Sequence, residues 1–98
     1  MADELQVDVS ETVRAWSVVV HGEIDMQTAA QLERVLDDVI AKGALLVTLD
    51  LEQVEFLDSS GLRVILGASN KLSEQEGQLL LEGASPAVER RTRFRLPA

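Results

Sequence analysis

Two adjacent hydroxyl side chains, Ser59 and Ser60, stand where an apolar strand is expected to give way to an apolar helix. Residues 54–57 end the strand, Asp58 follows, and the helix continues from Leu62. The first turn of a helix has backbone N–H groups without partners and the positive end of the helix dipole, so it favours an added anion such as phosphate. A serine at this place is suited either to phosphorylation or to the purely structural task of capping the helix.

The elements that must position these serines follow from the apolar pattern. Leu5, Val7 and Val9 alternate with polar residues and predict a half-buried strand, and the denser apolar run 16–20 predicts an interior strand. The segment 10–14 between them would form the turn. A hairpin is therefore expected ahead of the first helix.

That first helix is predicted after Gly22 from apolar residues at helical spacing. They are Ala29, Leu32, Leu36, Val39 and Ile40. Asp25 or Thr28 is available as the cap, and Gly43 lies just past the end. A third strand would follow over residues 44–49, whose continuous apolar run predicts burial on both faces of a sheet.

The helix that starts at the serines places its core-facing residues on one side. They are Leu62, Ile65, Leu66, Ser69 and Leu72. A polar turn over 74–77 and a short strand over 79–81 follow, and Pro86 is placed to open a short third helix over 87–90. Because βαβ connections are right-handed, this order predicts a mixed sheet with helices mainly on one face.

Two stretches also resemble a known family. They are Asp58-Ser59-Ser60-Gly61-Leu62 after an apolar strand and, further upstream, Gly22-Glu23-Ile24-Asp25-x-x-Thr28-Ala29. Together they are similar to the STAS-domain anti-sigma factor antagonists of bacterial sigma-factor control. The resemblance implies an α/β STAS fold with a mixed sheet of four or five strands, in one domain over residues 1–98. The match fails beyond Arg90, which predicts that the family's C-terminal helix is shortened or absent.

The resemblance implies that Ser59 is phosphorylated by an anti-sigma factor serine kinase and that a serine phosphatase removes the phosphate. It also implies that the kinase contacts the sheet edge near Ser59. The contact residues that we expect there are Asp25, Asp58, Ser60, Gly61 and Arg63. Arg63 stands where the family often has glycine, and it would either stay solvated or pair with a phosphate on Ser59.

No enzymatic activity is predicted. A serine hydroxyl is a poor nucleophile without a base, and no side chain adjacent to Ser59 would activate it, so ATP and catalytic groups would come from the kinase. The competing interpretation is the Gly-x-Ser-x-Gly elbow of hydrolases, but Leu57 stands where the first glycine would be. The one histidine, His21, precedes the serine, whereas hydrolases of that class place it after.

Four carboxylates, those of Glu23, Asp25, Glu55 and Asp58, are expected at neighbouring strand ends. Their oxygens could attract a hard cation such as Mg²⁺. Helix capping accounts for Asp25 and Asp58 without any ligand. We therefore predict neither a metal nor a cofactor.

The bulk composition limits the partners. Apolar content of 46% and charged content of 27% fit a folded chain, and the absence of cysteine removes thiol catalysis and thiolate metal sites. A net charge of −8 disfavours nucleic acid and anionic membranes. No apolar run approaches the roughly 20 residues of a membrane span, and residues 1–4 lack the basic start of a signal peptide. A cytoplasmic location is expected.

The resemblance, with which these observations agree, implies an anti-sigma factor antagonist. Unphosphorylated, it would bind its kinase and so free a sigma factor; phosphorylated, it would let go. The alternative is a non-switching STAS scaffold or ligand-binding module in a transport or stress-sensing assembly, which would need neither Asp58 nor Ser59. The short segment 91–98 predicts weak self-association or low thermal stability, because a missing helix would leave apolar surface uncovered.

Overall fold

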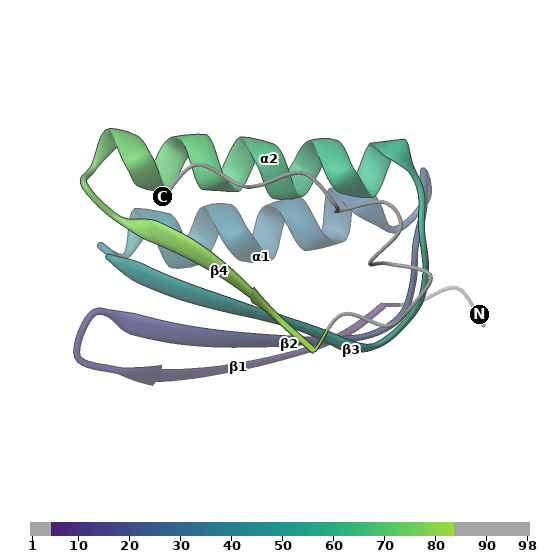
Figure 1. Ribbon diagram of the computed structural model, residues 1–98, viewed down its shortest axis with the longest axis horizontal. Helices are drawn as coiled ribbons and strands as arrows, with labels where there is room; N and C mark the ends of the chain where they lie inside the picture. The colour runs from purple at the N-terminus through teal and green to yellow at the C-terminus, as the bar shows by residue number, and fades with distance from the viewer. Residues whose placement is uncertain (1–4, 84–98) are drawn as a thin grey trace.

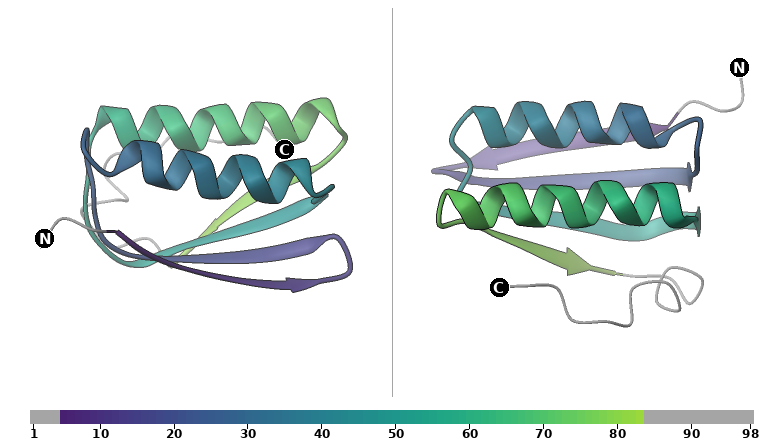
Figure 2. Two further views of the ribbon diagram at one scale, coloured as in Figure 1. Left: turned by 180° about the vertical axis from the view of Figure 1, so that it is seen from behind. Right: turned by 90° about the horizontal axis from the view of Figure 1, so that it is seen from above.

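Four strands and two helices make up residues 5–83, the part of the chain that the computed structural model describes. They are β1 (Gln6–Thr12), β2 (Ala15–Ile24), α1 (Ala29–Ala41), β3 (Leu46–Leu57), α2 (Ser59–Glu74) and β4 (Gln78–Glu82). The sheet order is β1-β2-β3-β4, antiparallel between β1 and β2 and parallel elsewhere. Both helices cover one face of this sheet (Figures 1 and 2). The prediction of a mixed sheet with helices mainly on one face is therefore confirmed.

The β1–β2 hairpin is longer than predicted. Pairing continues to Thr12 and Ala15, which leaves Val13 and Arg14 to form the turn instead of residues 10–14. Arg14 takes a positive φ of 55° in this two-residue turn. The prediction was wrong because the residues of this edge strand stay exposed, and their polarity resembles that of a turn.

β3 is buried on one face only, which corrects the prediction of burial on both. Val47, Leu49 and Leu51 are buried beneath the helices, whereas Leu46 and Thr48 on the opposite face are half-buried. No described element covers that second face (Figures 1 and 2). The continuous apolar run instead reflects the interior position of β3, between β2 and β4.

The helices build the core that supports the site. The side chains that α1 buries are those predicted from their spacing, namely Ala29, Leu32, Leu36, Val39 and Ile40. The predicted residues that α2 buries are Ile65, Ser69 and Leu72. Leu62 and Leu66 are only half-buried, because the buried stripe of α2 is centred on the side that carries Gly61 and Ala68.

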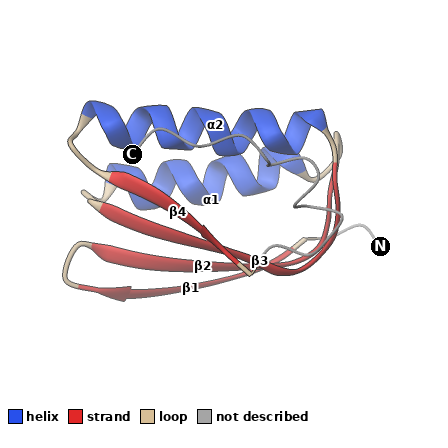
Figure 3. Cartoon of the chain, in the orientation of Figure 1, coloured by secondary structure: helices blue, strands red, loops and turns tan. Residues whose placement is uncertain are grey.

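The remaining elements agree with prediction where they are described. β4 forms as a short strand after a polar turn, and the loops lie at the two ends of the sheet (Figure 3). No helix within residues 5–83 combines the length and the apolar character needed to cross a membrane. The predicted helix over 87–90 and the predicted loss of a C-terminal helix after Arg90 lie outside the described residues.

Candidate phosphoacceptor site

Ser59 lies at the edge of the sheet that is formed by the C-terminal ends of β2 and β3. The two strands are parallel, and Ile24 pairs with Leu57 at their ends. The backbone N–H of Asp58 donates to the Ile24 carbonyl at 3.2 Å. The loops that lead into α1 and α2 therefore start side by side, at the right-hand end of Figure 1.

Asp58 occupies the N-cap of α2 and holds its first turn. One carboxylate oxygen, Oδ1, accepts from the backbone N–H of Ser60 at 2.9 Å and from that of Gly61 at 3.2 Å. The same oxygen accepts from the Ser60 hydroxyl. Two helix-start donors that would favour an added anion are thus bonded to the chain's own carboxylate. A phosphate on Ser59 would lie beside Asp58 without these two N–H groups free to receive it.

The two serines differ in accessibility. Ser60 is half-buried, and its hydroxyl donates to Asp58. Ser59 is exposed, and its side chain makes no hydrogen bond with residues 5–83. Of this pair, the Ser59 hydroxyl is the one that an enzyme can reach without breaking a contact that holds the helix start.

Gly61 brings the start of α2 against the sheet. A Cβ at this position would lie 2.5 Å from Ile24 Cγ2 and 2.5 Å from Leu57 Cδ1, well inside the separation of packed carbon atoms. Gly61 is itself buried. Gly61 is therefore a packing residue, whose missing side chain lets the start of α2 lie close to the ends of β2 and β3.

Comparison with known proteins places the chain in a family. The family model for the STAS domain matches residues 5–95, which include every element described above. The chain belongs to the STAS domain family. An anti-sigma-B factor antagonist of Listeria monocytogenes is 35% identical to it over 68 residues, which make up 69% of this chain and 60% of that relative. The STAS domain described here thus spans less than two thirds of the length of that relative.

Solved structures have the same fold as this STAS domain. The crystal structure of an anti-sigma factor antagonist from Mycobacterium paratuberculosis matches with a TM-score of 0.79 and 32% identity, over 91% of this chain and 75% of that one. The Bacillus cell fate determinant SpoIIAA in its phosphorylated form matches with a TM-score of 0.76 and 24% identity, over 91% of this chain and 82% of that one. The sheet with two helices on one face is therefore a STAS fold.

The loop between β2 and α1 of this STAS domain is fixed by Asp25 and Thr28. Asp25 Oδ1 accepts from the backbone N–H groups of Gln27 at 2.9 Å and Thr28 at 3.1 Å. The Thr28 hydroxyl donates to the Glu23 carbonyl at 2.7 Å and accepts from the Asp25 N–H at 2.9 Å. Either residue was predicted to cap the helix. Thr28 stands at the N-cap of α1 without a side-chain bond to the helix, and the two residues together clamp the loop.

Acidic side chains surround this edge of the STAS domain. Glu23 and Glu55 are exposed there, while the carboxylates of the two loops are half-buried. Arg63 is exposed one turn after Ser59 and forms no ion pair with residues 5–83. No three acidic or histidine side chains of the described residues are grouped as ligands for a metal ion.

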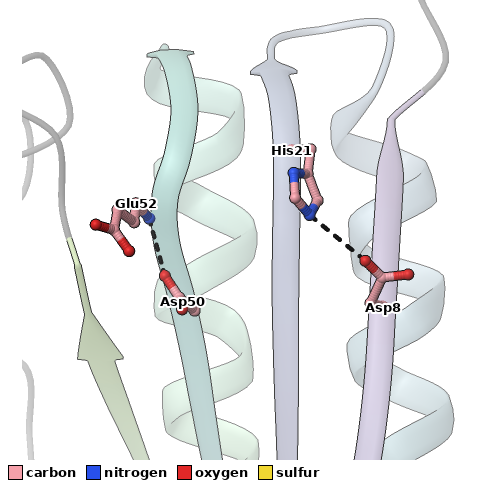
Figure 4. Close-up of polar contacts among 4 residues, drawn as sticks. All are labelled: Asp8, His21, Asp50 and Glu52. Carbon is pink, nitrogen blue, oxygen red and sulfur yellow. Dashed lines mark hydrogen bonds and ion pairs between the residues drawn. The ribbon is translucent and has the colours of Figure 1, made fainter.

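His21 lies on the face of the sheet away from both helices. Val20 is buried beneath the helices, so the next side chain along the strand points to the opposite face. There His21 Nε2 lies 3.4 Å from Asp8 Oδ2 on β1 (Figure 4). Ser59 begins a helix on the covered face, so His21 is not positioned to take its proton.

Proposed function

We propose that this STAS domain is an anti-sigma factor antagonist and that phosphorylation of Ser59 switches its binding to an anti-sigma factor kinase. Unphosphorylated, it binds the kinase and so frees a sigma factor; phosphorylated, it lets go until a serine phosphatase restores it. The observation that carries the proposal is the accessible Ser59 hydroxyl beside Ser60, whose hydroxyl is bonded to Asp58. The names of the Listeria and mycobacterial relatives, both anti-sigma factor antagonists, support the same function.

The domain acts as a substrate and binding module rather than as an enzyme. Within residues 5–83 no side chain is hydrogen-bonded to the Ser59 hydroxyl, so this part of the chain places no base against it. The kinase supplies ATP and the catalytic groups. Its contact surface on this domain is the edge that carries Asp25, Asp58, Ser60 and Arg63, supported from below by Gly61.

Phosphate on Ser59 weakens binding through its charge. It adds about −1.5 to −2 charges beside Asp58, and the helix end offsets only about half a charge. A partner carboxylate within about 4 Å would be repelled by roughly 4 kcal/mol per charge pair at an effective dielectric constant near 20. Since about 1.4 kcal/mol is tenfold in affinity, we expect affinity to fall by about two orders of magnitude or more without a change of fold.

The test measures phosphate transfer and binding with purified anti-sigma factors from the source genome. Ser59→Ala should bind the cognate factor but accept no phosphate, and Ser59→Asp should bind poorly. Ser60→Ala is the matched control and should still be phosphorylated. Mass spectrometry that places the phosphate on Ser60 would refute the choice of acceptor, and tight binding by Ser59→Asp would favour a non-switching STAS scaffold.

A further inference from the structure

An exposed apolar side chain lies at the same edge of the sheet as Ser59. Met26, in the loop between β2 and α1, is 81% exposed. Among the described residues only Val13 is a more exposed large apolar side chain, at 92%, and it lies in the β1–β2 turn at the opposite end of β2. Single exposed apolar residues are common on protein surfaces. Whether Met26 is a binding residue must therefore be argued from its surroundings.

The backbone on both sides of Met26 is fixed. Before it, the Asp25 N–H donates to the Thr28 hydroxyl, and after it, the Thr28 N–H donates to the Asp25 carboxylate. Thr28 is 5% exposed and also donates to the Glu23 carbonyl. A side chain presented from a loop that is already ordered requires little further ordering of the backbone when a partner binds.

This loop adjoins the loop that carries Ser59. The Asp58 N–H reaches the Ile24 carbonyl, two residues before Met26, at 3.2 Å. The start of α2 is packed on the same strand end, since a Cβ at Gly61 would meet Ile24 Cγ2 at 2.5 Å. A protein that binds over Ser59 therefore also meets the loop that carries Met26.

The charges around Met26 define the kind of partner surface that fits. Glu23 and Asp25 precede it, Asp58 lies at the neighbouring strand end, and the chain as a whole carries a net charge of −8. A partner surface with an apolar pocket surrounded by basic groups complements this arrangement. Residues that dominate binding are typically apolar anchors in a desolvated pocket within a polar rim. Methionine suits such a pocket because its side chain is unbranched and polarizable.

We infer that Met26 inserts into an apolar pocket on the anti-sigma factor kinase, while basic groups around that pocket face the carboxylates of this edge. The inference rests on the proposed function and adds a source of affinity that is separate from the phosphate. Ser59 and its neighbours set whether the complex persists. Met26 sets how tightly the unphosphorylated domain is held.

The experiment uses the full chain, unphosphorylated, and an anti-sigma factor of the source genome that binds the parent protein. Met26→Ala should weaken the affinity measured by titration calorimetry by about ten- to hundredfold, the range expected when a methionine side chain loses its burial. Met26→Leu should retain most of the affinity. Val13→Ala, at the opposite end of the sheet, should bind like the parent. Circular dichroism checks that each variant is folded.

The outcomes separate this inference from the proposed function. If the parent binds and is released on phosphorylation but Met26→Ala binds equally well, the inference is wrong and the function stands. If no anti-sigma factor binds the parent, the proposed function fails and the inference fails with it. If Met26→Ala instead abolishes a dimer seen in sedimentation while anti-sigma factor affinity is unchanged, Met26 belongs to a contact between copies and the inference is overturned.

Discussion

Replacing Gly61 by alanine should push the start of α2 away from the sheet and lower the stability of the domain. The added Cβ would lie 2.5 Å from Ile24 Cγ2 and 2.5 Å from Leu57 Cδ1, and 3.2 Å from Ile24 Cβ. Ile24 and Leu57 are almost fully buried, and isoleucine is stiff at χ1, so neither side chain can move aside easily. Overpacking of this kind costs about 1–3 kcal/mol. Two contacts this close favour the upper part of that range.

Alanine also favours the helix by up to about 1 kcal/mol relative to glycine. The net loss in the free energy of unfolding should therefore be about 1–2 kcal/mol. Gly67 provides the matched control, because it lies in the same helix and a Cβ there would meet nothing within 4 Å. Gly67→Ala should stabilise the domain by about 0.5–1 kcal/mol.

Urea denaturation of the parent and both variants measures the difference through the transition midpoints at a common m-value. The two substitutions should shift the midpoint in opposite directions although the chemical change is identical. A Gly61→Ala variant as stable as the parent would refute the argument that α2 is seated through this glycine. Because Ser59 lies two residues earlier, the same variant should, under the proposed function, also bind the anti-sigma factor more weakly.

Two further predictions concern side chains on which the site does not depend. Ser69 is 1% exposed and its hydroxyl has no hydrogen-bond partner within residues 5–83, so Ser69→Ala removes an unsatisfied buried polar group and should leave stability unchanged or raise it by about 1 kcal/mol. A clear loss of stability in urea would show that the hydroxyl makes a needed bond. Under the proposed function, His21→Ala should leave phosphorylation and partner binding unchanged, since the imidazole pairs with Asp8 on the far face of the sheet. Loss of phosphate transfer in the folded variant would require a new role for His21.

The elements that could be predicted from the sequence are those that a side-chain pattern decides. The apolar spacing of α1 determined its buried face, and the change from strand to helix at Asp58 marked the loop of the site. The hairpin was predicted too short because exposed edge positions tolerate polar residues. Leu62 and Leu66 have the same helical spacing as the buried residues of α2. Spacing alone could therefore not show that they are only half-buried.

The way the two loops of the site are brought together could not be predicted, because it depends on contacts between segments far apart in the chain. β3 shifts register twice against β2 before Ile24 meets Leu57, and no residue pattern signals those shifts. The sequence likewise contains Gly61 without indicating that the end of β2 lies against it. The contact between Asp58 and the Ser60 hydroxyl is local, but the sequence does not determine which of the two serine hydroxyls meets that carboxylate. The Asp-x-x-Thr spacing was the available signal for the loop clamp.

The pairing of Ile24 with Leu57 has a consequence for how the chain is recognised. The surface around Ser59 consists of two segments, the loop after β2 and the start of α2. Folding brings them together through the Asp58 N–H and the packing at Gly61. A partner that binds this composite surface recognises the folded arrangement of two segments rather than a linear sequence motif. Under the proposed function the kinase therefore distinguishes folded copies from unfolded ones. Under that proposal, unfolded chains with the same serine would neither occupy the kinase nor be phosphorylated, so the switch would respond to folded molecules.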